Sequence, residues 1–287
     1  MIIYYNIGFK VPKLKNLRKY LSFGLPLIPT NLSSWTLDVS DRLIIGILLG
    51  TAAVGYYSPG YSLGNIVLML VMPFSILLFP LLTKNYENGK IEEVKKYLFY
   101  SMKYYLLLAI PTVIGISLLS EPLITIISTP EVAQEGFLIT PFSAISGMLA
   151  GIYAIMLQVL LLKKKTRITG IFWIASAIIN ITFNILVIPY LGILGAAIIT
   201  LISYMIVVIP VSKYYLRFNS IDFRFIIKCL ISSVLMCFII ICIKPTNIFN
   251  ILITITLCSI SYFLIIIILK GVTKEELSFF RDILRLN

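Results

Sequence analysis

Three ionisable residues lie inside a hydrophobic stretch, residues 21–50, that is long enough to cross a membrane. They are Asp38, Asp41 and Arg42. An ionised side chain near the bilayer centre costs about 2.5–3.5 kcal/mol on insertion scales, so such groups face protein or water and mark substrate or ion sites by default. A guanidinium could hold a phosphate through paired hydrogen bonds. The two carboxylates could instead bind a cation.

On a helix, four residues of this stretch form one polar stripe: Asn31, Trp35, Asp38 and Arg42. They fall within roughly 60° of one another at about 100° of rotation per residue. Asp38 precedes Arg42 by four residues, the order that favours an acid–base pair, and Asp41 lies to one side. Two interpretations stay open. The charges form a salt bridge that only fixes helix packing, or they face a substrate.

A second set of candidate ligands recurs every four residues in the next apolar segment. Tyr57, Tyr61 and Asn65 share one helical face there. With Asn31 and Trp35 they could face sugar or water. An aromatic stripe at helical spacing is also a common packing feature, and the spacing alone does not separate the two roles.

Composition places the chain in a membrane. Hydrophobic residues make up 59% of its 287 residues and charged residues only 13%, against about 25% charged residues in soluble domains. The net charge of +12 follows membrane topology and does not indicate a nucleic-acid partner. Histidine is absent, which argues against a zinc-dependent membrane protease, and the four cysteines lack metal-type spacing. We therefore expect neither a metal site nor a cofactor.

Eight apolar segments are long enough to span a bilayer, which predicts an all-α integral membrane protein. They cover residues 21–49, 54–82, 97–119, 137–162, 168–189, 192–215, 225–243 and 248–269. Of the 24 lysines and arginines, all except Arg42 and Lys244 lie before the first segment or in the connections that follow every second segment, with the segment ends beside them. By the positive-inside rule, both termini are cytoplasmic and the chain crosses eight times. No cleavable signal is predicted.

Two cytoplasmic segments have an amphipathic pattern. These are the loop 83–96 and the tail 271–287. Each predicts either a short helix lying on the membrane surface or a solvated connector.

Residues 180–204 contain a sequence pattern that is typical of one protein family. It consists of Asn180, Asn184, Pro189, Gly192, Gly195-Ala196-Ala197 and Thr200. This pattern resembles the oligosaccharide flippases, the Wzx-like polysaccharide exporters of the MATE and MOP superfamily. The stretches 26–42 and 54–57 look like the opening of that family's second lobe, and the resemblance covers about residues 20–215.

The resemblance implies a transporter, not an enzyme, that moves lipid-linked oligosaccharide across the cytoplasmic membrane by alternating access, with Na⁺ or H⁺ as a coupling cation. It divides the chain into a basic cytoplasmic segment (1–20), a six-helix lobe (21–215), two further transmembrane helices (216–270) and a cytoplasmic tail (271–287). Members of the family have two lobes, and this chain begins where the connection between lobes would end. We therefore expect a second lobe or a homodimer partner.

Other function classes remain open at this level. A cation-coupled drug or metabolite exporter of the same superfamily would share the fold. A membrane-embedded glycan polymerase or ligase would need a catalytic outer loop, and the longest outer loop, 120–136, offers only Glu121, Glu131 and Glu135 as ionisable groups. A partner subunit that does not itself transport is the third alternative.

Overall fold

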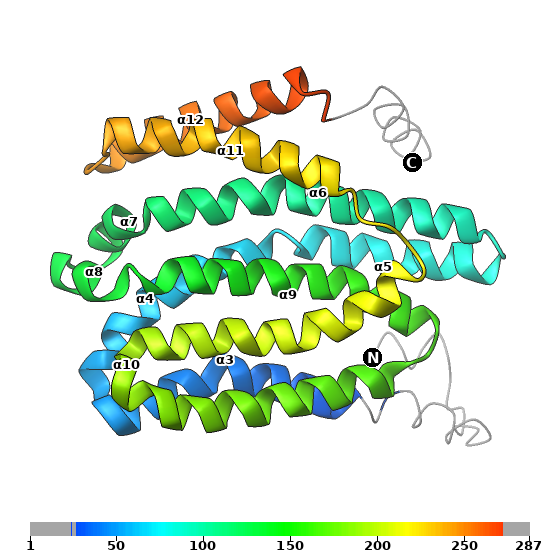
Figure 1. Cartoon of the computed structure of the whole chain (residues 1–287), viewed down its shortest axis with the longest axis horizontal. Coiled ribbons are helices and arrows are strands. Elements are labelled where there is room, and N and C mark those ends of the chain that lie inside the picture. Colours follow the sequence, from blue (N-terminus) through cyan, green and yellow to red (C-terminus); the bar gives the residue numbers. More distant parts are fainter. Residues whose placement is uncertain (1–23, 25–26, 272–287) are drawn as a thin grey trace, which may run out of the picture.

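The computed structural model describes residue 24 and residues 27–271 of the chain, and within them the fold is all-α (Figure 1). The predicted basic segment 1–20 and the predicted tail helix after residue 271 lie outside the described residues. Among those that are described, six helical stretches are long and apolar enough to cross a membrane. They are Thr51–Glu87, Ile91–Leu118, Ile139–Leu162, Thr166–Leu216, Phe223–Ile243 and Ile248–Ile268. By the length and composition of the described helices, six stretches qualify as membrane spans, so the predicted count of eight crossings is not confirmed.

The two extra predicted segments do correspond to helix. The first is α3 (Leu27–Leu49), whose centre carries Asp38, Asp41 and Arg42 and is too charged to qualify by composition. The second arises because α10 (Thr166–Leu216) folds back on itself. Gly192 has φ 60° and ψ −148°, a conformation essentially restricted to glycine. Figure 1 shows the two arms of α10, residues 166–191 and 193–216, running side by side.

The second predicted segment divides into α4 (Thr51–Met69) and α5 (Met72–Glu87). The break lies at Leu70 and Val71, directly before the first turn of α5, which contains Pro73. Proline fits the first turn of a helix because backbone nitrogens in that turn have no hydrogen-bond acceptor within the helix. The prediction of one continuous segment over residues 54–82 is thus interrupted at this point.

The prediction of a separate surface helix in the loop 83–96 is wrong. α5 continues to Glu87, and α6 (Ile91–Leu118) begins after a short turn in which Gly89 has φ 73°. Glu92 and Glu93 lie in the first turn of α6, where negative charge is favourable for the helix dipole. The amphipathic pattern therefore belongs to the ends of two long helices.

The remaining helices complete a bundle whose connections cluster at its two ends. They are α7 (Ser120–Ile127), α8 (Pro130–Gly136), α9 (Ile139–Leu162), α11 (Phe223–Ile243) and α12 (Ile248–Ile268). In Figure 1 the turns between α5 and α6, α9 and α10, and α10 and α11 lie at one end, and these turns are rich in lysine and arginine. α7, α8, the fold of α10 and the α11–α12 connection lie at the other.

α4 is fixed against α9 by very close packing. A Cβ atom at Gly64 would lie 2.6 Å from Ser143 Cβ and from the Ala144 nitrogen. The Ser143 hydroxyl donates a 2.7 Å hydrogen bond to the Tyr61 carbonyl oxygen. Small residues allow such an approach in membranes, where helix association depends on packing and on hydrogen bonds between helices. This seam holds the tyrosine face of α4 in place.

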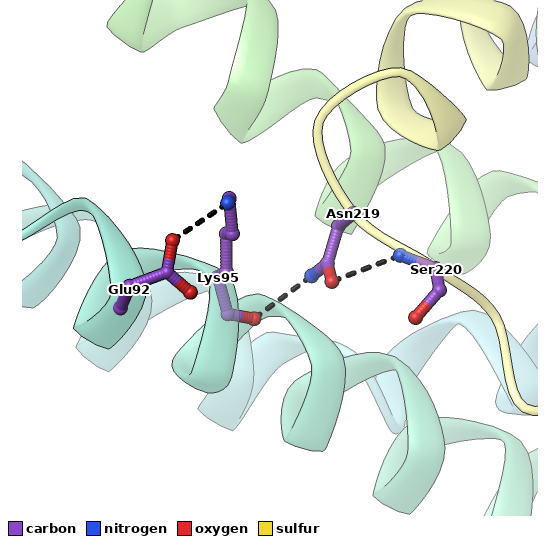
Figure 2. A network of polar contacts seen from close by, with 4 residues as sticks. All are labelled: Glu92, Lys95, Asn219 and Ser220. Carbon is purple, nitrogen blue, oxygen red and sulfur yellow. Dashed lines mark hydrogen bonds and ion pairs between the residues drawn. The ribbon is translucent and has the colours of Figure 1, made fainter.

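At the edge of the bundle α11 packs on α6, and α12 packs on α11. Their connection to α10 is anchored by Asn219, whose amide donates a 2.8 Å hydrogen bond to the Lys95 carbonyl oxygen (Figure 2). The Ser220 amide donates in turn to Asn219 Oδ1 at 2.9 Å, and Lys95 pairs with Glu92 at 2.7 Å. This anchor ties the α10–α11 connection to the first turns of α6.

Candidate functional site

Asp41 is the centre of a buried polar network between α3, α4 and both arms of α10. Its side chain is 1% exposed. The Tyr57 hydroxyl donates to Asp41 Oδ2 at 2.8 Å, and the Asn184 amide donates to Oδ1 at 2.7 Å. The Thr200 hydroxyl also donates to Oδ2. Three neutral groups from three separate segments therefore converge on one carboxylate.

Asn180 extends the network around Asp41 by a second set of hydrogen bonds. Its Oδ1 accepts hydrogen bonds from the Ser40 hydroxyl at 2.9 Å and from the Asn184 amide at 3.1 Å. Its own amide donates to the Thr200 hydroxyl oxygen at 3.4 Å. Asn184 Oδ1 is buried and has no hydrogen-bond partner among the residues that the structure describes. The network thus presents carboxylate, amide and hydroxyl oxygens to one another in a space closed to water.

The charge of Asp41 has no counterpart nearby. In the described part of the chain, no lysine or arginine nitrogen lies within 4.0 Å of its carboxylate. An ionised carboxylate removed from water is costly unless an opposite charge or a full set of hydrogen bonds compensates it. A site of this composition can take up a proton or a hard cation, because both neutralise the carboxylate.

Asp38 lies one turn before this network and is partly exposed. Its Oδ1 accepts hydrogen bonds from the Tyr61 hydroxyl at 3.1 Å and from the Tyr204 hydroxyl at 3.4 Å. Arg42 instead lies over the Tyr61 ring, with its guanidinium carbon 5.2 Å from the ring centroid. In the described residues no ion pair within 4.0 Å joins Asp38 and Arg42, so the interpretation of the two as a direct salt bridge is not supported. Tyrosine hydroxyls occupy the position that the guanidinium was expected to take.

The predicted site residues divide into three groups. Asp41 and Tyr57 belong to the buried network, and Asp38, Arg42 and Tyr61 lie beside it in mutual contact. The remaining three candidates are Asn31 and Trp35, exposed on α3, and Asn65, partly exposed on α4.

Tyr57 and Tyr61 stack on each other with centroids 5.5 Å apart, and both are buried. The Tyr57 hydroxyl donates a hydrogen bond to Asp41 and the Tyr61 hydroxyl donates one to Asp38. The two tyrosines therefore pack against each other and also bind the two carboxylates.

Five residues of these contacts were not among the predicted site residues. They lie beside Asp41 or on α10, and they are Ser40, Asn180, Asn184, Thr200 and Tyr204. The available signal was the pair of asparagines four residues apart in a long apolar segment. Their distance of about 140 residues from Asp41 along the chain hides the contact until the fold is known.

Comparison with known proteins gives consistent matches. A family model described as polysaccharide biosynthesis protein matches residues 1–131. The chain is 22% identical over 231 residues to a probable low-salt glycan biosynthesis flippase, Agl15, of Haloferax volcanii. It is 26% identical over 178 residues to a probable flippase, AglR, of the same organism. The predicted resemblance is confirmed. This chain resembles the flippases of polysaccharide biosynthesis.

The fold comparison agrees. The structure matches the lipid II flippase MurJ in an inward closed conformation with a TM-score of 0.70 at 20% identity. The match covers 99% of this chain and 59% of MurJ. The matches to Agl15 and AglR cover 80% and 60% of this chain but 49% and 37% of those proteins. The chain therefore spans about half the length of the curated relatives it matches, and those relatives are named as flippases, not as enzymes.

Proposed function

We propose that this chain forms one lobe of a flippase that moves lipid-linked oligosaccharide across the cytoplasmic membrane for polysaccharide biosynthesis. The observation that carries the proposal is the state of Arg42. Its Nε is buried without a hydrogen-bond partner, and no carboxylate oxygen within the described residues lies within 4.0 Å of the guanidinium. An arginine held in a membrane helix with no carboxylate in direct contact is suited to bind an anion that arrives from outside the protein.

A lipid-linked oligosaccharide carries a phosphate group next to its sugars, and the face of α3 suits both parts. Arg42 is assigned to the phosphate. Asn31 and Trp35 lie along the same exposed face toward the start of the helix, and Asn65 lies on α4. Amide groups can hydrogen-bond sugar hydroxyls, and an indole offers a flat apolar surface. Tyr61 positions the guanidinium, which lies over its ring, and its hydroxyl donates to Asp38 Oδ1.

The same proposal includes eight membrane crossings with both ends of the chain on the cytoplasmic side. α3, the α4–α5 unit, α6, α9, each arm of α10, α11 and α12 would each cross once. The clustering of basic connections at one end of the bundle supports this topology. Residues 21–215 then form the transport lobe, and residues 216–270 form two additional helices at its edge.

A partner must cover the polar face of α3. Trp35 is 61% exposed, and its neighbours Ile28 and Leu32 are 60% and 61% exposed. With Asn31, Asp38 and Arg42 on the same side, this face would otherwise meet lipid at considerable cost. The partner is a second lobe or a second copy of this chain, since closed symmetric assembly is the commonest form of oligomer.

The Asp41 network is the proposed site for the coupling cation, Na⁺ or H⁺. Its carboxylate, hydroxyl and amide oxygens suit a hard cation, and in the described residues Asn184 Oδ1 is a buried acceptor without a hydrogen-bond partner. In the described residues no cluster of three or more cysteine, aspartate or glutamate side chains is placed to hold a metal ion.

Complementation tests the function. The chain is expressed together with its partner lobe in cells that lack their own oligosaccharide flippase, and lipid-linked oligosaccharide on the outer leaflet is measured. We expect export to be restored. Export of cationic drugs without any effect on glycan would identify a drug exporter of the same fold. Transport by the purified chain as a monodisperse monomer in liposomes would refute the need for a partner.

A further inference from the structure

The connections at the basic end of the bundle differ in their charge. The α5–α6 turn and the helix ends beside it mix lysines with glutamates, and Lys95 forms an ion pair with Glu92 at 2.7 Å (Figure 2). In the α9–α10 turn, the first turn of α10 and the end of α10, the charged residues are all cations. We call them the α10 basic patch, and all six are exposed: Lys163, Lys164, Lys165, Arg167, Lys213 and Arg217.

The fold brings the two parts of this patch together, although they are about 50 residues apart in the sequence. Lys163 Nζ lies 4.6 Å from the centroid of the Phe218 ring, and Lys165 Nζ lies 5.9 Å from the centroid of the Tyr214 ring. Each of these rings directly follows one of the other cations of the patch in the sequence. The lysines of the turn and the cations at the end of α10 therefore form one surface.

No acidic side chain of the described residues forms an ion pair within 4.0 Å with any cation of the patch. The sequence contains no aspartate or glutamate from residue 136 to residue 221. The acids at the starts of the neighbouring helices have other partners, since Glu92 pairs with Lys95 and Asp222 accepts a 3.0 Å hydrogen bond from the Phe225 backbone nitrogen. Like charges on one surface repel one another. The patch is therefore stabilised by an anion that comes from outside the protein.

The start of α10 adds to this preference for negative charge. The first turn of a helix exposes backbone N–H groups and carries a partial positive charge, so acids are favourable there and cations are not. α6 has Glu92 and Glu93 in its first turn, whereas α10 has no acid there and carries Arg167 instead. Lys165, at the N-cap position of α10, makes no side-chain hydrogen bond to the helix. A bound anion would supply the negative charge that this helix start lacks.

The apolar side chains beside the patch indicate that the anion belongs to a lipid. Leu216 is 48% exposed and Phe223 is 66% exposed, and Tyr214 and Phe218 are partly exposed between the cations. Aromatic and apolar side chains interleaved with lysine and arginine at the end of a membrane helix are typical of the boundary between hydrocarbon and headgroups. A small free anion would gain nothing from these apolar neighbours.

We propose that the α10 basic patch is a docking surface for the phosphate headgroups of anionic phospholipids in the cytoplasmic leaflet. The inference rests on the proposed function in taking the basic end of the bundle as cytoplasmic. Clusters of lysine and arginine at the cytoplasmic ends of membrane helices attract anionic lipids. Both arms of α10 reach the patch, so bound lipid holds together the two arms that bring Asn184 and Thr200 to Asp41.

Thermal unfolding of the purified full chain in detergent tests the proposal without requiring transport. Added phosphatidylglycerol should raise the melting temperature by several degrees, because a ligand that binds the folded state stabilises it, and phosphatidylcholine should not. High salt should reduce the shift, since it screens exposed charges. Shifts of equal size with the two lipids would overturn the proposal.

Paired variants locate the effect on the protein. Lys164→Gln with Lys213→Gln should reduce the shift several-fold. The matched control, Lys84→Gln with Lys90→Gln, removes two exposed lysines from the mixed α5–α6 region and should keep the shift. Lys164→Arg with Lys213→Arg keeps the charge and should keep the shift too, which separates a lost headgroup contact from a damaged fold. Phosphatidylglycerol molecules retained by each variant, counted by native mass spectrometry, give a second readout. Equal shifts and equal lipid counts in the patch variant and its control would overturn the proposal.

Inorganic phosphate and soluble polyglutamate test the other sources of negative charge. Neither should reproduce the shift at the same concentration of negative charge. A shift with inorganic phosphate alone would indicate a small-anion site, and a shift with polyglutamate alone would indicate an acidic protein partner, and either result would overturn the assignment to lipid. Reaction of Lys164→Cys with a reagent outside cells would instead defeat the topology of the proposed function, and the melting experiment would still decide whether the patch binds lipid.

Discussion

Arg42→Lys keeps the positive charge on α3 but replaces a planar fork of donors by a single ammonium group. If Arg42 binds the substrate phosphate, the variant retains one strong contact where the wild type makes two. The structure indicates that the protein itself should tolerate the change, because Asp38 is held by Tyr61 and Tyr204 and does not depend on Arg42. We expect normal abundance in the membrane with impaired transport.

The size of the effect follows from the contact that is lost. A hydrogen bond to a charged group contributes about 1.5–3 kcal/mol. At about 1.4 kcal/mol per factor of ten, losing one such bond should lower transport roughly 10-fold to 150-fold. The assay is outer-leaflet oligosaccharide in the complementation strain, with membrane abundance measured in parallel. The lost contact between the guanidinium and the Tyr61 ring, 5.2 Å apart, adds only a small term to stability.

The double variant Asp38→Asn with Arg42→Gln separates binding from structure. A purely structural pair would be rescued by removing both charges together, since a single change leaves one charge unpaired. Because no ion pair joins the two residues in the described structure, we expect the double variant to fold as well as either single variant and to transport poorly. Restored transport in the double variant would end the claim that Arg42 binds substrate.

Three further predictions address packing, coupling and topology. Gly64→Ala should destabilise the protein by about 1–3 kcal/mol in thermal unfolding, because its Cβ would overlap α9, whereas Gly55→Ala, which meets nothing within 4 Å, should be nearly neutral. Equal melting temperatures would contradict the close α4–α9 seam. Asp41→Asn should remove the dependence of transport on an imposed Na⁺ or H⁺ gradient, and an unchanged gradient dependence would rule out the Asp41 network as the cation site. Glu131→Cys should react with an impermeant thiol reagent added outside cells and Lys164→Cys should not, and outside reactivity of the latter would overturn the proposed crossing pattern.

Local features of the structure were largely readable from the sequence. The apolar segments coincide with helices to within a few residues because length and composition decide whether a segment can exist in lipid. The break before Pro73 and the turns at Gly89 and Gly192 follow from backbone constraints of single residues. The loop 83–96 was misread, since an amphipathic pattern is equally compatible with a surface helix and with the ends of two membrane helices.

The candidate site was readable only in part. Asp38, Asp41 and Arg42 stood out because intramembrane charge is expensive, and that cost does not depend on the fold. Which partner each charge has was not readable. The i to i+4 spacing favoured an Asp38–Arg42 pair, yet Tyr61 and Tyr204 supply better placed donors from α4 and α10.

The sequence by itself determined that this is a multi-span helical membrane protein with charges that protein or water must cover, because both conclusions depend on transfer energies of residues and segments. Only the tertiary structure decided that Asp41, and not Asp38, is enclosed. Enclosure requires Asn184 and Thr200, about 140 and 160 residues away along the chain, to be brought beside Tyr57 by the fold of α10 at Gly192. Hydrogen bonds of a few ångströms between distant segments leave no periodic trace along the chain, so no pattern of spacing could have revealed them.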